Sequence, residues 1–218
     1  MAEHFIFHHP LSMIIAGPSQ SGKSVFVGKL LENPEYIQPT PEAITWFYGA
    51  ENQEQFETIK QQSKLPITFI EGVPDSQYLI GLKHHLIILD DLMEDIGKSK
   101  EIANLFTKGC HHRNISVILI LQNIFHQDRK MKSIRLNAKY TVLFKNPNDA
   151  LQIRFMGRQM FPKHPDYLQN AYEQATKRQY GYLIIDSSQQ TPDNERLSTN
   201  IFPPEFFYKF IPKNKYTK

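Results

Sequence analysis

Residues 11–31 read LSMIIAGPSQSGKSVFVGKLL, and this stretch decides the fold class. Its first part, Leu11 to Ala16, is an apolar run of the length that a buried strand has. A short loop rich in glycine and serine follows. From about Gly22 onward, apolar residues such as Phe26 and Leu30 recur at helical spacing. The sequence therefore predicts a buried strand, a tight loop and a helix in direct succession.

The loop matches the pattern GxxxxGK[ST] at every fixed position, which is typical of a phosphate-binding loop between a strand and a helix. Backbone N–H groups of such a loop and of the helix N-terminus donate to phosphate oxygens. Lys23 would place a cation on the β- and γ-phosphates, and the Ser24 hydroxyl would bind Mg²⁺. The predicted cofactors are ATP and Mg²⁺. The predicted nucleotide-binding residues are Gly17, Pro18, Ser19, Gln20, Ser21, Gly22, Lys23, Ser24 and Val25.

A pair of carboxylates follows a second apolar run, Leu86 to Leu89. Open α/β sheets bind ligands outside the carboxyl ends of their strands, so we expect Asp90 and Asp91 beside the phosphates. Asp90 is the predicted second Mg²⁺ ligand, and Asp91 would orient or deprotonate the attacking water. Gln122 ends the most apolar run of the chain and is the predicted uncharged sensor of the γ-phosphate or of the water.

Apolar runs alternate with amphipathic segments along most of the chain, which favours an α/β fold with a mostly parallel central sheet flanked by helices. We expect residues 1–200 to form one P-loop ATPase domain. Residues 201–218 form an aromatic and basic tail, whose phenylalanines we expect to pack back on the core. The predicted strands are 11–16, 43–48, 67–70, 85–89, 115–122, 140–144 and 180–186. The predicted helices are 25–31, 51–62, 99–108 and 148–177, the last interrupted at 161–165.

The charges of the chain are segregated. Residues 123–163 contain nine lysines and arginines against two acidic residues, whereas residues 32–101 contain 13 acidic residues against five basic ones. A basic stretch of this kind favours double-stranded DNA as a polyanionic partner, and a solvated surface is the alternative. The candidate DNA-binding residues are Arg129, Lys130, Lys132 and Arg135.

Two features bear on the compartment. The single cysteine, Cys110, cannot form an internal disulfide. The longest apolar run, Ile115 to Leu121, is far shorter than the roughly 20 residues that a membrane-spanning helix needs. We therefore expect an intracellular protein without a membrane partner.

Arg113 directly precedes the strand that Gln122 ends, so the two residues are expected at opposite ends of that strand. Arg113 would lie far from its own nucleotide and near a neighbouring subunit. This placement suits a catalytic arginine finger supplied in trans across a ring interface. The rivals for that role are Arg129, Arg135, Arg154 and Arg158.

Several blocks taken together resemble the genome-packaging ATPases of the FtsK/HerA superfamily, from about Phe5 to Pro203. They are the loop GPSQSGKS, the strand TWFYG, the run LIILDD, the block KGCHHRNISVILILQNIFHQ and the block LNAKYTVLFKNP. The chain is most similar to the packaging ATPases of Polinton/Maverick elements and adintovirus-like viruses, to which a poxvirus packaging ATPase is related. Many relatives in the wider superfamily have Asp-Glu where this chain has Asp90-Asp91.

The resemblance implies a P-loop NTPase of the ASCE, RecA-like type. Lys23 and Ser24 match the Walker A positions, Asp90 and Asp91 match Walker B, and Gln122 matches the superfamily's glutamine. The implied assembly is a homo-oligomeric ring of five or six subunits that pumps double-stranded DNA into a preformed capsid, with capsid or portal proteins as partners. The implied location is the site of virion assembly, in the host nucleus or a cytoplasmic viral factory.

Two other functions remain open from the residues alone. A P-loop kinase acting on a nucleotide or small molecule would use the same loop, with Arg154 and Arg158 in place of a lid. A nucleotide-gated capsid assembly factor would bind ATP with little turnover. Stimulation of hydrolysis by DNA would separate the motor from both.

Overall fold

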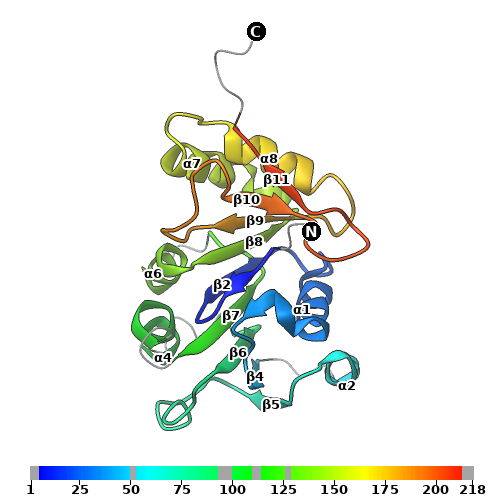
Figure 1. Cartoon of the computed structure of the whole chain (residues 1–218). Coiled ribbons are helices and arrows are strands. Elements are labelled where there is room, and N and C mark those ends of the chain that lie inside the picture. Colours follow the sequence, from blue (N-terminus) through cyan, green and yellow to red (C-terminus); the bar gives the residue numbers. More distant parts are fainter. Residues whose placement is uncertain (1–4, 50–52, 93–99, 110–113, 126–128, 213–218) are drawn as a thin grey trace.

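A mixed sheet of nine strands organises the chain, whose computed structural model describes residues 5–49, 53–92, 100–109, 114–125 and 129–212 (Figure 1). The strand order is β11-β10-β9-β8-β2-β7-β6-β4-β5. Six neighbouring strands, from β8 to β5, run parallel, and β9, β10 and β11 continue the sheet in antiparallel fashion. The bounds are β2 Ser12–Ala16, β4 Ala43–Tyr48, β5 Ile67–Glu71, β6 His85–Asp90, β7 Ile115–Leu121, β8 Tyr140–Phe144, β9 Tyr182–Asp186, β10 Leu197–Thr199 and β11 Tyr208–Phe210.

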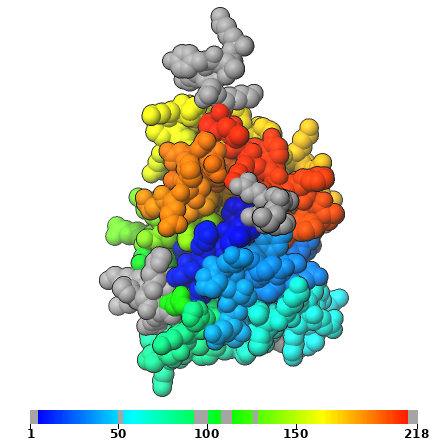
Figure 2. All heavy atoms as spheres, in the orientation of Figure 1, coloured from blue at the N-terminus to red at the C-terminus, as the bar shows by residue number. Residues whose placement is uncertain are grey.

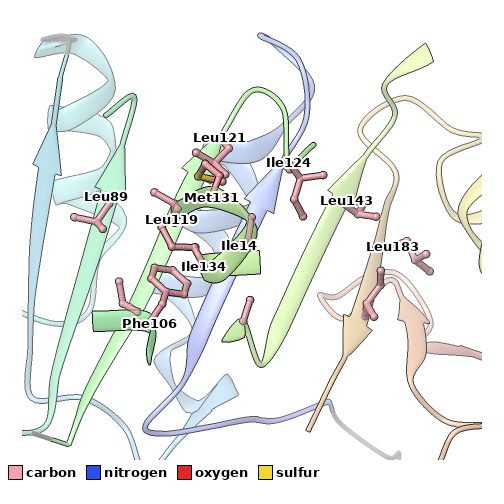
Figure 3. Packing of buried hydrophobic residues seen from close by; sticks show 14 of the residues in the cluster. Ile14, Leu89, Phe106, Leu119, Leu121, Ile124, Met131, Ile134, Leu143 and Leu183 are labelled. Atoms are coloured by element: carbon pink, nitrogen blue, oxygen red, sulfur yellow. The ribbon is translucent and has the colours of Figure 1, made fainter. Parts of the chain in front are cut away.

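The central strands are buried on both faces, as a parallel sheet covered by helices requires. In β6, Leu86 and Ile88 belong to the hydrophobic cluster on one face, whereas Ile87 and Leu89 belong to the cluster on the other. Figure 3 shows the second cluster, in which Met131 and Ile134 of a covering helix meet Leu119 and Ile14 of neighbouring strands. Continuous apolar runs in the sequence are the consequence of this two-sided burial.

Helices cover both faces of the sheet. Helices α1 (Lys23–Glu32) and α2 (Gln53–Gln62) contribute to the cluster on one face. Helices α4 (Lys100–Asn104), α6 (Arg129–Asn137), α7 (Ala150–Met160) and α8 (Tyr167–Ala175) contribute to the cluster on the other (Figure 1). The smaller elements are β1 Phe7–His8 and β3 Ile37–Gln38, which pair with each other, the 3₁₀ helices Pro34–Tyr36 and Pro147–Asp149, and the π-helical turn Leu105–Gly109 that extends α4.

The last predicted strand begins two residues later than the sequence indicates. Tyr180 has a φ of 61°, which is incompatible with a strand, and β9 starts only at Tyr182. Gly181 allows the turn, because a Cβ there would lie 2.3 Å from the carbonyl oxygen of Ala175. The apolar pattern continues through this turn, so periodicity alone could not place the boundary.

Two segments form regular structure that the sequence pattern does not predict. The basic stretch contains helix α6, in which Met131 and Ile134 are buried among otherwise polar residues. Within residues 201–218, β11 pairs with β10, and Phe202 and Phe210 are buried. In Figure 2 the described part of this segment, in red, lies against the body of the molecule. The prediction that tail phenylalanines pack back on the core is confirmed for these two, whereas Phe206 is 92% exposed. In the described residues, no helix is long and apolar enough to cross a membrane.

Candidate functional site

The loop from Gly17 to Gly22 closes tightly at the carboxyl end of β2. The Gly17 amide donates to the carbonyl oxygen of Leu121 at the end of β7, at 3.2 Å. A Cβ on Gly17 would lie 2.6 Å from the Cβ of Phe144 and 2.7 Å from Ser21 Oγ, so only glycine fits. Gly22 has a φ of 106° and begins α1 in a left-handed conformation. Both fixed glycines are therefore required by the backbone itself.

Lys23 reaches back across this loop. Its Nζ donates to the carbonyl oxygens of Gly17, at 2.6 Å, and Pro18, at 2.9 Å. Burial lowers the pKa of Lys23, and the nearby carboxylates Asp90 and Asp91 oppose that shift. The ammonium group is thus held over the loop, close enough to both carboxylates to interact with them.

Ser21 supplies a polar atom that the described protein leaves unpaired. Its Oγ is buried and has no hydrogen-bond partner among the described residues. An unpaired buried hydroxyl costs free energy unless a ligand pairs with it. Together with the glycine cradle and the Lys23 cation, this hydroxyl fits a phosphate group at the N-terminus of α1.

Asp90 ends β6 and is the most perturbed carboxyl group of the site. Burial, and secondarily the neighbouring charge of Asp91, raises the pKa of Asp90 from 3.8 to about 6, while Lys23 and Trp46 act in the opposite direction. The Gly49 amide donates to the Asp90 carbonyl oxygen at 3.0 Å. Asp91 is exposed and has a φ of 54°. Asp90 and Asp91 thus concentrate negative charge beside the loop.

This carboxylate pair and Ser24, at the start of α1, fit a divalent cation. Oxygen ligands with concentrated negative charge are what Mg²⁺ prefers. A divalent ion would also offset the burial and repulsion that raise the pKa of Asp90. Among the described residues, no group of three or more His, Cys, Asp or Glu side chains forms a metal site of the protein's own.

Gln122 lies between the loop and the carboxylates because of the strand order. Strand β7 pairs with β2 on one side and with β6 on the other. Leu121 is opposite Ala16, so Gln122 directly follows the strand at the level of Gly17, and its side chain is exposed. The ends of three neighbouring strands, with the loop that follows β2, thus bring Lys23, Gln122 and Asp90 to one edge of the sheet.

The remaining predicted residues are placed less uniformly. Ser19, Gln20 and Val25 are exposed on the loop and the first turn of α1. The four candidate DNA-binding residues share helix α6: Arg129 and Lys132 are exposed, Lys130 and Arg135 partly buried. Arg135 lies over the ring of Phe125, at 5.4 Å. Arg113 lies outside the described residues.

The sequence reasoning missed residues that extend the site beyond the loop. A pocket of about 450 Å³ adjoins Gly22 and Val25, and its other walls come from the connection between α8 and β9 and from the segment 199–210. The signal available in the sequence is a run of polar and aromatic residues, KRQYGY at 177–182, between two apolar elements.

Comparisons with known proteins place this arrangement in a fold. No protein-family model and no curated protein sequence matches the chain. In structure it is similar to B204, the DNA-packaging ATPase from Sulfolobus turreted icosahedral virus, with a TM-score of 0.56 and 14% identity over 84% of this chain and 95% of that one.

Genome packaging NTPase B204 from Sulfolobus turreted icosahedral virus 2 is similar as well. Its complex with ATP-γS has a TM-score of 0.50 and 16% identity over 84% of this chain and 95% of that one. Its complex with AMP has a TM-score of 0.50 and 14% identity over 83% and 94%. The chain therefore has the fold of the P-loop NTPases, with a mostly parallel sheet flanked by helices.

Proposed function

We propose that the chain is an ATPase that drives double-stranded DNA into a capsid of a virus or virus-like element. The observation that carries this proposal is the strand order β2-β7-β6, which brings Lys23, Gln122 and the pair Asp90-Asp91 to one edge of the sheet. A phosphate cradle, an uncharged donor and two carboxylates are the parts that hydrolysis of a phosphoanhydride needs.

The chemistry follows from the position of each group. The loop amides, Ser21 and Lys23 hold the phosphates and offset the charge that develops on the transferred phosphoryl group. Ser24 and Asp90 would hold Mg²⁺, which supplies further positive charge to the phosphate oxygens. Asp91 is exposed and would accept a proton from the attacking water, while Gln122 would orient that water. Each residue acts within reach of the loop.

The coupling to DNA rests on charge and resemblance. Helix α6 presents Arg129 and Lys132 to solvent within the basic stretch, and contacts to phosphates suit a motor that must ignore sequence. The similar structures are described as DNA-packaging and genome packaging proteins. We propose a ring of five or six subunits with Arg113 as the finger supplied in trans. Capsid or portal proteins are its partners, at the intracellular site of virion assembly.

Steady-state ATP hydrolysis tests this proposal, measured with and without long linear double-stranded DNA at 50 and 200 mM salt. We expect DNA to stimulate hydrolysis at low salt, and we expect higher salt to weaken the stimulation because phosphate contacts are screened. Lys23→Ala should lower both rates by about 10²- to 10³-fold. Lys60→Ala, an exposed lysine on α2, is the matched control. A rate of hydrolysis that does not change with DNA would contradict the motor. It would favour the P-loop kinase or the nucleotide-gated assembly factor instead.

A further inference from the structure

The pocket beside the phosphate loop begins where the loop ends. Gly22, just before α1, and Val25 and Lys29 of α1 form one wall, and Arg178 and Tyr180, which precede β9, form another. Its volume of about 450 Å³ lies within the range of small-molecule sites. Since Gly22 borders both the loop and the pocket, a ligand whose phosphates occupy the loop would extend directly into this pocket.

Tyr180 is held at the junction in an unfavourable conformation. Its φ of 61° is rare for a bulky residue, and its side chain is 57% exposed. The Gly181 amide donates to the Arg178 carbonyl oxygen at 3.1 Å and closes the turn that carries Tyr180. A Cβ on Gly22 would lie 3.2 Å from Tyr180 Cβ and Cδ1, so this side chain borders the loop itself. Backbone strain of this kind concentrates where a ligand is bound.

The lining of the pocket also includes a side-chain amide. Asn200 lines the pocket with a φ of 57°, and its side-chain amide lies 3.3 Å from Thr199 Oγ1. A side-chain amide can both donate and accept, so Asn200 can pair with the edge of a heteroaromatic ring. The pocket therefore combines an exposed aromatic face with an amide.

We infer that this pocket holds the base of the nucleotide, with a purine stacked on Tyr180 and its edge facing Asn200. This inference rests on the proposed function, because the phosphate loop must hold the nucleotide's phosphates. A purine has a larger π-face than a pyrimidine, so stacking favours ATP over UTP. Stacking of a base on an aromatic side chain is worth about 1–3 kcal/mol, equivalent to about 5- to 150-fold in affinity.

Equilibrium binding tests the inference without hydrolysis. The dissociation constants of ATP, UTP and inorganic tripolyphosphate are measured with Mg²⁺ for the wild type, Tyr180→Ala, Tyr180→Phe and Phe155→Ala. We expect Tyr180→Ala to weaken the binding of ATP at least fivefold and to reduce the preference for ATP over UTP. The affinity for tripolyphosphate should stay unchanged. Tyr180→Phe should retain the wild-type values because it keeps the ring. Phe155→Ala is the control, a similarly exposed aromatic on α7.

The contrary results separate the two proposals. If the wild type binds tripolyphosphate and ATP but Tyr180→Ala changes neither, the base pocket is wrong and the phosphate site stands. If Tyr180→Ala weakens the binding of ATP and of tripolyphosphate equally, Tyr180 acts only by supporting the loop. That result also overturns the stacking assignment. If the wild type binds neither ligand, the proposed function fails and the inference with it. Thermal unfolding of each variant verifies that it is folded.

Discussion

Lys23 carries the largest share of the proposed chemistry at the scale of single residues. It is the cation over the loop, and it touches the carbonyl oxygens of Gly17 and Pro18. Removing one preorganised electrostatic group from an active site typically lowers kcat by about 10²- to 10³-fold. We expect Lys23→Ala to lose hydrolysis on that scale, measured in steady state, with an unchanged circular dichroism spectrum. A loss below tenfold would contradict the assigned role.

Asp90 provides a second residue-scale prediction, through pH. The pKa of this carboxyl group is higher in the folded chain than in the unfolded chain, so ionisation destabilises the fold. The resulting penalty is absent below the unfolded pKa of 3.8, grows as pH rises, and is complete above about 6. The full shift corresponds to about 3 kcal/mol. Asp90 is therefore a residue that lowers stability at neutral pH.

Asp90→Asn removes this penalty. We expect the variant to gain about 1 kcal/mol of unfolding free energy at pH 4.5 and about 3 kcal/mol at pH 7.5, while ATP hydrolysis is lost. Urea denaturation at the two pH values measures the difference. The wild type, measured alongside at each pH, is the reference. A gain that does not increase with pH would show that Asp90 is not perturbed in this way.

Helix α6 carries the prediction at the scale of elements. Its exposed residues Arg129 and Lys132 are replaced by glutamine together, which leaves the buried Met131 and Ile134 in place. Each lost phosphate contact reduces the slope of log K against log salt by about 0.9. We expect the double variant to weaken DNA binding irrespective of sequence and to reduce the slope by about 2, measured by fluorescence anisotropy.

Lys60 on α2 and Lys64, two residues after that helix ends, are both exposed and provide a charge-matched control for this experiment. Their replacement by glutamine lowers the net charge equally but on the segment that covers the other face of the sheet. If the control weakens DNA binding as much as the α6 variant does, net charge and not α6 carries the affinity.

The C-terminal strand β11 tests whether the tail belongs to the domain. Phe210 is 7% exposed, and its carbonyl oxygen accepts from the Tyr167 hydroxyl at 2.5 Å. Phe206, four residues earlier, is 92% exposed. We expect Phe210→Ala to cost about 3 kcal/mol of unfolding free energy and Phe206→Ala less than about 0.5 kcal/mol. Equal costs, measured by urea denaturation, would mean that residues 208–210 do not support the fold.

At the scale of the whole molecule, the sequence predicts the central strands of the sheet better than the segments around β9, β10 and β11. Two-sided burial makes β2, β6 and β7 continuous apolar runs, and the loop between β2 and α1 has glycines that its backbone demands. Because these constraints act on residues that are close in the chain, they can be predicted from the sequence. The predicted cluster of Lys23, Asp90, Asp91 and Gln122 follows from them.

The segments around β9, β10 and β11 depend on contacts between residues that are far apart in the sequence. Strand β11 is three residues long and is stabilised by pairing with β10 and by Tyr167. Tyr180 lies in a left-handed turn that no apolar pattern marks, yet it borders Gly22, which is far away in the sequence. The proposed base pocket could therefore be identified only in the folded chain, whereas the phosphate loop could be predicted from the sequence.

The central claim is that hydrolysis at this site moves the chain along DNA. Displacement of a fluorescent third strand from a triplex at the end of linear double-stranded DNA measures such movement directly. We predict displacement that requires ATP and Mg²⁺, that is absent in Lys23→Ala, and that is delayed in proportion to the length of duplex before the triplex. Hydrolysis of ATP without any displacement, under conditions in which the chain binds the same DNA, would contradict the claim.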